Sequence, residues 1–149
     1  MPGQLSEIQI NNLLASQLVG RMACTDGMQP YIVPVTYAFD GEYIYGQTNE
    51  GHKLSILRKN PAVCFEVDRM IDLSHWQSII IYGQFEELQE EDAKNAREYL
   101  FTRVFPMMTI SKIHSYGHEV EENAYENIWV REVMYRIKIN SITGRFETK

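Results

Sequence analysis

Residues 21–48 read RMACTDGMQPYIVPVTYAFDGEYIYGQT, with two Asp-Gly pairs that separate three runs of β-forming residues. Asp26-Gly27 and Asp40-Gly41 are strong hairpin signals, because Gly tolerates the positive φ that tight hairpin turns require. The flanking runs are rich in β-branched and aromatic side chains, which favour strands. The stretch therefore predicts an antiparallel meander of three strands, over 21–25, 31–39 and 42–48.

Outward from this meander, the chain carries signals for three further strands and three helices. Six strands with few helices indicate a small six-stranded antiparallel β-barrel, mainly β with flanking helices, in a single domain over residues 1–149. Gly83 is expected at a β-bulge. The expected elements are a helix capped by Ser6, a short helix between Gly51 and Asn60, strands over 62–67 and 76–88, a helix from Gln89 toward Phe101 or Val104, an irregular or helical stretch over 107–116, a polar loop over 118–127 and a last strand over 128–139.

Composition and charge exclude several classes of protein. Hydrophobic residues make up 44% of the 149 residues and the formal net charge is −6. Proteins that bind nucleic acids or anionic membranes usually have a positively charged surface, so we expect neither partner. No stretch approaches the roughly 20 apolar residues of a membrane span, and the start lacks the features of a signal peptide. Cys24 and Cys64 form no CxxC pair, which is typical of buried free thiols in a reducing cytoplasm, and we expect a cytoplasmic protein.

The short helix after the meander has an unusual first turn. Asn49 is expected to cap it and Asn60-Pro61 to end it. A helix N-terminus is already positive, so the basic residues His52 and Lys53 are misplaced there unless an anion binds. Free N–H groups together with a lysine suit a phosphate. The alternative is that Glu50 balances Lys53 and that both side chains are simply solvated.

Two other features have a functional and a plain interpretation. Pro34 interrupts the second strand of the meander and cannot donate to a ladder, so the unpaired backbone of Val35 and Thr36 could hydrogen-bond a flat heterocycle. The plain interpretation is an edge strand that proline shields. Trp76 could wall off a ring and Ser78 could reach a phosphate or a ribityl hydroxyl, or they are a core tryptophan and a surface serine.

The histidines do not indicate a metal site. His114 and His118 have the i, i+4 spacing of helical metal ligands. Gly117 between them disfavours a regular helix, and no third ligand accompanies them. We therefore predict that the protein binds no metal ion.

An ordered series of short motifs resembles the pyridoxamine 5′-phosphate oxidase-like superfamily, nearest its branch of split barrels related to nitroimidazole-resistance proteins. The likeness covers about Val19 to Leu88, with weaker agreement near the last strand. The matching motifs are Gly20-Arg21-Met22, Pro30 to Tyr37, Ile44-Tyr45-Gly46, Gly51-His52-Lys53-Leu54, Asn60 to Phe65, Trp76 to Ile80 and Tyr82-Gly83.

The resemblance implies a split β-barrel of Greek-key type that forms a homodimer with FMN at its interface. By position, Pro34, Val35, Thr36 and Tyr37 match the strand that faces the isoalloxazine ring. His52 and Lys53 match the pair that binds the phosphate, although the family often has Arg or Lys where His52 stands. Trp76 and Ser78 match the strand that closes the site around the ribityl-phosphate end.

Two departures from the family pattern limit the functional expectation. The nitroimidazole-resistance branch commonly carries a histidine in the strand before the short helix, where this chain has Gly46 or Gln47. The C-terminal arginine-rich substrate motif of pyridoxamine phosphate oxidases is also missing, so we do not expect oxidation of vitamin B6.

The sequence thus predicts an FMN-dependent oxidoreductase that reduces a small acceptor, such as a nitro compound, a quinone-like molecule or another flavin, with electrons from NAD(P)H. No side chain is expected to act as the catalytic acid or base, because the cofactor carries the redox chemistry. The alternative is a module that stores or senses a flavin, a deazaflavin or haem without turnover. Haem would need an axial ligand, for which His114 or His118 is available.

Overall fold

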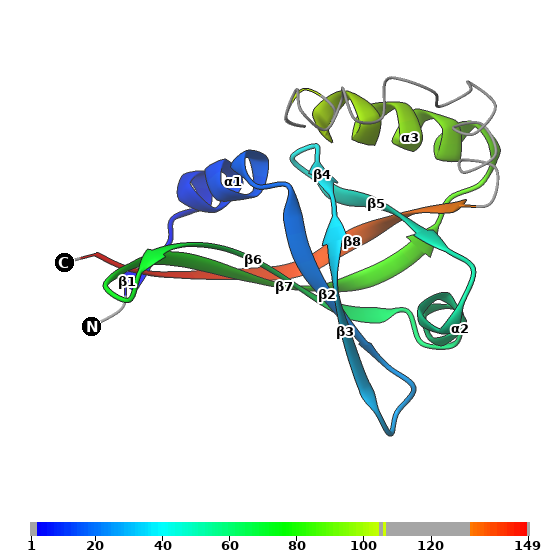
Figure 1. Ribbon diagram of the computed structural model, residues 1–149, viewed down its shortest axis with the longest axis horizontal. Coiled ribbons are helices and arrows are strands. Elements are labelled where there is room, and N and C mark those ends of the chain that lie inside the picture. Colours follow the sequence, from blue (N-terminus) through cyan, green and yellow to red (C-terminus); the bar gives the residue numbers. More distant parts are fainter. Residues whose placement is uncertain (1–2, 105, 107–131, 149) are drawn as a thin grey trace, which may run out of the picture.

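Within the residues that the computed structural model describes, 3–104, 106 and 132–148, eight strands form one antiparallel sheet (Figure 1). The strand order is β3-β2-β6-β7-β8-β5-β4, and β1 pairs with β8 at the chain ends. The elements are β1 (Gly3–Gln4), α1 (Glu7–Ser16), β2 (Val19–Thr25), β3 (Pro30–Thr36), β4 (Ala38–Phe39), β5 (Tyr43–Asn49), α2 (His52–Lys59), β6 (Ala62–Asp72), β7 (His75–Glu87), α3 (Glu90–Val104) and β8 (Glu132–Glu147).

The predicted fold class, a mainly β antiparallel barrel with flanking helices, is confirmed. Eight strands replace the expected six for two reasons. β1 has only two residues, too few to carry a pattern. The strand expected over 31–39 divides at Tyr37, because the residues up to Thr36 pair with β2 and Ala38–Phe39 pair with β5.

The two Asp-Gly turns form as predicted. Asp26 accepts hydrogen bonds from two backbone amides of its own turn at 2.8 Å, and Asp40 does the same at 2.7 and 2.8 Å. Gly27 and Gly41 adopt φ values of 99° and 97°, which residues with a Cβ rarely adopt. These hydrogen bonds within each turn help to fix the register of the two hairpins.

The core lies inside the curved sheet and is closed by helices. Leu13 and Leu14 of α1 are buried against the interior side chains of the strands. The buried phenol of Tyr37 donates to the Leu14 carbonyl at 2.7 Å and ties α1 to the barrel. α3 covers the outside of β4, β5 and β8 with a second apolar cluster. Figure 1 shows α1 and α3 on one side of the sheet, with α2 near the far end of the β6–β7 ribbon.

The longest strands extend beyond their predicted ends. β6 continues to Asp72 and β8 continues to Glu147. β8 pairs with β1, β5 and β7, and the register between β7 and β8 shifts at Tyr82/Gly83, the expected bulge. Polar residues in these extensions obscure the period-2 pattern, because both faces of the ribbon are partly exposed beyond the core.

Candidate functional site

The N-terminus of α2 has no side-chain cap. Its N-cap residue is Gly51, and no side chain accepts a hydrogen bond from the first-turn amides. The expectation that Asn49 caps this helix is wrong: Asn49 is the last residue of β5, where it pairs with Glu132. Because the first four N–H groups of a helix have no intrahelical acceptor, this end remains a concentration of free donors with a partial positive charge.

Two basic residues stand on this turn. Lys53 is half-buried, and burial lowers the pKa of its ammonium group. It makes no ion pair with a carboxylate among the described residues. Glu50, the residue expected to balance it, instead holds Arg58 with both carboxylate oxygens at 2.9 Å. Lys53 is therefore a partly desolvated cation that has the Cys24 thiol as a neighbour but no described carboxylate partner, an arrangement that favours an anionic ligand.

The same turn lies beside the edge strand of the sheet. The ring of His52 meets the ring of Tyr31 edge to face, with centroids 5.7 Å apart. Tyr31 belongs to β3, which ends the strand order, so one β3 edge has no strand partner within the described part of the chain. The structure thus places His52, one of the predicted phosphate pair, beside Tyr31, a residue of the strand that also carries the predicted ring-facing residue Pro34.

The four residues predicted on this strand have different environments. Pro34 is exposed opposite Arg21 of β2, which confirms its place in an edge strand. Val35 is buried and Thr36 is exposed. Tyr37 lies in the core with its amide and its phenol already hydrogen-bonded inside the protein. A ligand can therefore reach backbone N–H groups only along the exposed edge of β3, before Tyr37.

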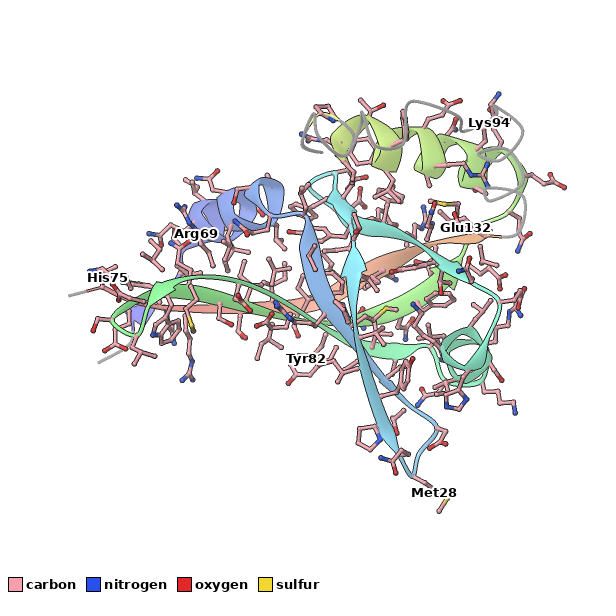
Figure 2. The ribbon with its side chains drawn as sticks, in the orientation of Figure 1. Met28, Arg69, His75, Tyr82, Lys94 and Glu132 are labelled. Atoms are coloured by element: carbon pink, nitrogen blue, oxygen red, sulfur yellow. The ribbon has the colours of Figure 1, made fainter. Side chains whose placement is uncertain are left out.

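Trp76 and Ser78 lie far from this turn in the same protomer. They pair with Met70 and Asp68 of β6, a strand that begins just after α2. At a rise of about 3.3 Å per residue, the six steps from Ala62 to Asp68 span about 20 Å. In Figure 2, His75, the neighbour of Trp76, lies at the end of the molecule opposite α2. One protomer therefore does not bring these two residues to the α2 turn.

Trp76 and Ser78 instead belong to an outward sheet face, which consists of alternate residues of β3, β2, β6, β7 and β8. Tyr82 projects from this face, away from α1 and α3 (Figure 2). Several apolar side chains of the face are exposed. They are Ile32 at 65%, Met70 at 65%, Ile80 at 38% and Tyr82 at 56%.

An ionic cluster lies within the outward face. Arg21 bridges two carboxylates of β6, at 3.4 Å to Glu66 and 3.0 Å to Asp68. Burial, with a further contribution from the neighbouring Asp68 carboxylate, raises the pKa of Glu66 to about 7 although Arg21 opposes the shift. The cluster is charged and partly desolvated, and it is surrounded by apolar side chains.

The family described as Pyridoxamine 5'-phosphate oxidase matches residues 6–146 of this chain. The chain belongs to this family. The predicted resemblance is thereby confirmed over nearly the whole sequence, including the final strand where the motifs were weak.

One curated protein and two solved structures show what this chain is similar to. An uncharacterised protein of Rhizobium meliloti is 32% identical over 84 residues, and the match covers 56% of each chain, so this chain spans about half the length of the curated relative. A crystal structure described as a FAD-binding protein from Mesorhizobium loti has a TM-score of 0.78 at 26% identity, covering 100% of this chain and 98% of the other. A candidate 5-nitroimidazole antibiotic resistance protein from Bacteroides thetaiotaomicron has the same fold, with a TM-score of 0.74 at 14% identity over 98% of this chain and 87% of the other.

Gly46, one of the two positions expected from the sequence to match the histidine of the nitroimidazole-resistance branch, is closed to a larger side chain. Gly46 faces the barrel interior, and a Cβ added there would overlap the hydroxyl and the ring of Tyr135. Tyr135 is fully buried and its hydroxyl has no described hydrogen-bond partner. The neighbouring Gln47 is half-buried, and its Oε1 likewise has no described partner. A histidine at 46 would have to displace the Tyr135 ring.

Sequence reasoning missed the residues that support the site in this member of the oxidase family. Tyr31 and Arg58 were not singled out, although Tyr31 packs on His52 and Arg58 engages Glu50. Arg58 is eight residues from Glu50 and 29 from its second partner, Glu87, spacings that carry no local signal.

Two further expectations concern groups outside the site. His114 and His118 lie outside the described residues. No cluster of three or more potential metal ligands occurs in the described part of the chain. Cys24 is a buried free thiol, and Cys64 is a free thiol of intermediate exposure. None of the described helices is long and apolar enough to span a membrane.

Proposed function

We propose that this protein binds FMN, with the phosphate at the N-terminus of α2, and acts as a flavin-dependent oxidoreductase that transfers electrons from NAD(P)H to a small acceptor. The observation that carries the proposal is the uncapped first turn of α2, with half-buried Lys53 lacking a described carboxylate partner. An anion with several acceptor oxygens satisfies both the free amides and the ammonium group.

The roles of the residues follow from their chemistry. Lys53 and the α2 amides would hold the phosphate, with His52 as an additional donor. The unpaired β3 edge around Pro34 would align the ring system, because an edge strand presents unpaired backbone groups. When bound, the flavin supplies the redox chemistry, and the protein supplies orientation and exclusion of water. Candidate acceptors are a nitro compound, a quinone-like molecule or another flavin.

The structural neighbour named as a FAD-binding protein supports a flavin, since it is 26% identical to this chain over its full length. We propose FMN because one helix N-terminus with one lysine matches a single phosphate group. FAD carries a diphosphate and an adenosine, so the identity of the released flavin distinguishes the two cofactors.

We further propose that the working unit is a homodimer with the cofactor at its interface. Trp76 and Ser78 lie about 20 Å or more along the ribbon from the start of β6, which adjoins α2. They can approach a phosphate at α2 only from a second copy of the chain. The outward face around Tyr82 exposes the apolar surface that such a contact would cover.

An absorbance spectrum of the purified protein tests the proposal. Oxidised flavin gives bands near about 370 and 450 nm, and chromatography of the heat-released chromophore identifies FMN or FAD. Anaerobic NADH or NADPH should bleach the 450 nm band, and its recovery on adding a nitro compound or a quinone would identify the acceptor class. A protein that stays oxidised would store or sense the flavin instead. A colourless protein that takes up no added FMN would contradict the whole proposal.

A further inference from the structure

Arg58 holds two carboxylates at once, one on each side of its guanidinium group. It donates from Nη1 and Nη2 to the two oxygens of Glu50, both at 2.9 Å. It also donates from Nε and Nη2 to Glu87, at 3.1 and 2.8 Å. Paired, parallel hydrogen bonds of this type fix geometry as well as charge. Hydrogen bonds from Arg58 hold the pKa of Glu87 below its usual value.

We call the hydrogen bonds from Arg58 to Glu50 and Glu87 the Arg58 clamp. The position of Glu50 connects this clamp to the proposed phosphate site. Glu50 immediately precedes Gly51, the N-cap of α2, and Gly51 has no side chain to occupy the first-turn amides. A carboxylate at the start of a helix is attracted to those amides and to the positive end of the helix dipole. Glu50 would therefore be a competitor for the donors that an incoming phosphate needs, if its carboxylate were free to turn toward them.

We propose that Arg58 is a positioning residue that keeps the Glu50 carboxylate away from the α2 N-terminus and so leaves the first-turn amides and Lys53 open to a phosphate. The inference rests on the proposed function, since it concerns the same anion site. Arg58 does not touch the ligand. It acts by neutralising and orienting Glu50, with Glu87 at the end of β7 as the second anchor.

A charge-based role and a purely structural role predict different patterns of variants. If the clamp only stiffens the loop, then removing either Glu50 or Arg58 weakens binding in a similar way, and removing both does not help. If Arg58 acts by restraining a competing carboxylate, then only its own loss is harmful, and removing Glu50 as well restores binding. Glutamine has nearly the same shape as glutamate but carries no charge, so Glu→Gln is the appropriate replacement for each carboxylate.

The experiment is a titration of apo protein with FMN, followed by quenching of flavin fluorescence, for four variants and the wild type. We expect Arg58→Gln to raise the dissociation constant roughly tenfold, which corresponds to about 1.4 kcal/mol of charge competition. Glu50→Gln should bind FMN as tightly as the wild type or more tightly. The double variant Glu50→Gln/Arg58→Gln should recover to within about threefold of the wild type. Lys59→Gln, which removes a positive charge from an exposed position in the last turn of α2 and leaves the contacts of Arg58 in place, is the matched control and should bind as the wild type does.

Three outcomes would overturn the inference: an unchanged affinity in Arg58→Gln, a loss in Glu50→Gln as large as that in Arg58→Gln, or a double variant that binds no better than Arg58→Gln. Urea unfolding of each variant checks that the protein is folded, and the double variant supplies the test even if Arg58→Gln is less stable. Failure of the proposed function is distinguishable, because the wild type itself would then take up no FMN.

Discussion

At the scale of single residues, Lys53 is the side chain whose environment most clearly calls for a ligand. A half-buried ammonium group normally has a counter-charge, because burial penalises the ion. Here the nearest acidic candidate in sequence, Glu50, is bound to Arg58 instead. Burial alone lowers the pKa of Lys53, whereas a bound phosphate would raise it again and keep the group charged.

Lys53→Ala should weaken FMN binding by about 1.5–3 kcal/mol, the range for a hydrogen bond to a charged group. Isothermal titration with FMN measures the effect. Lys59→Ala, in the last turn of the same helix, removes an equal charge from an exposed position and should leave the affinity unchanged. Equal affinity in Lys53→Ala and wild type would mean that the phosphate binds elsewhere.

Glu66 gives the protein a pH dependence of known sign. Its folded-state pKa of about 7 lies above the usual 4.5 for glutamate, so the folded state holds its proton more tightly than the unfolded state does. The stabilising contribution is complete below about pH 4.5 and is lost as the pH rises through about 7. A second copy covering the outward face would strengthen the desolvation and leave this sign unchanged.

Glu66→Gln should therefore be more stable, relative to the wild type, at pH 8 than at pH 5, by about 1 kcal/mol once the pKa shift is discounted for solvent screening of this partly exposed group. Urea unfolding at the two pH values measures the difference. Glu42→Gln, in an exposed turn, controls for the loss of one negative charge. A Glu66→Gln effect that is the same at both pH values would show that the carboxyl titrates at its ordinary pKa.

At the scale of secondary-structure elements, the Asp-Gly hairpins and the helix after Ser6 were predictable because their determinants are local. Ser6 and Gln9 form a complete capping box, with bonds of 3.2 and 2.8 Å. The cap of α2 was not predictable in the same way. Asn49 is a good N-cap residue, but the ladder between β5 and β8 extends to it, and that partner strand lies more than 80 residues away in the chain.

Tertiary contacts also explain why the site was only partly predictable. His52, Lys53 and Pro34 lie on local motifs, a helix start and an interrupted strand, so the sequence alone indicated them. Tyr31 and Arg58 act through partners brought together by folding, which single-sequence patterns do not encode. Whether Trp76 and Ser78 join the site depends on a second chain and stays a prediction.

The pairing of β5 with β8 depends on the absence of a side chain at Gly46. Gly46→Ala places a Cβ against the buried Tyr135 ring and should lower the free energy of unfolding by about 1–3 kcal/mol, the cost of overpacking a core. Urea unfolding measures it. Gly51→Ala, where an added Cβ meets no atom within 4 Å, should cost less, about 0.5 kcal/mol, because alanine is a poorer N-cap residue than glycine. Unchanged stability in Gly46→Ala would mean that the Tyr135 ring moves aside freely.

At the scale of the whole molecule, the outward face predicts the oligomeric state. Tyr82→Asp puts a charge in the centre of the exposed apolar surface, so we expect it to convert a dimer to a monomer and to weaken FMN binding together with dimerisation. Light scattering at micromolar concentration measures the mass. Ile8→Asp, on the exposed side of α1, is the control and should remain dimeric. A wild-type monomer that binds FMN tightly would contradict a shared site.

The position of β8 in the sheet also governs how the chain can fold as it is made. β8 lies between β7 and β5 in the sheet. Strands β4 and β5 therefore cannot pair with the rest of the sheet until β8 has been added. Strands β2, β3, β6 and β7 can pair with one another while the ribosome still holds the C-terminal part of the chain. The β4–β5 hairpin can join the sheet only after β8, the last strand to be synthesised, is available. Because β5 leads directly into α2, the position of α2 depends on the same step. The first turn of α2, the proposed phosphate site, is therefore expected to become ordered only after translation of β8, so the proposed cofactor would bind after synthesis of the chain.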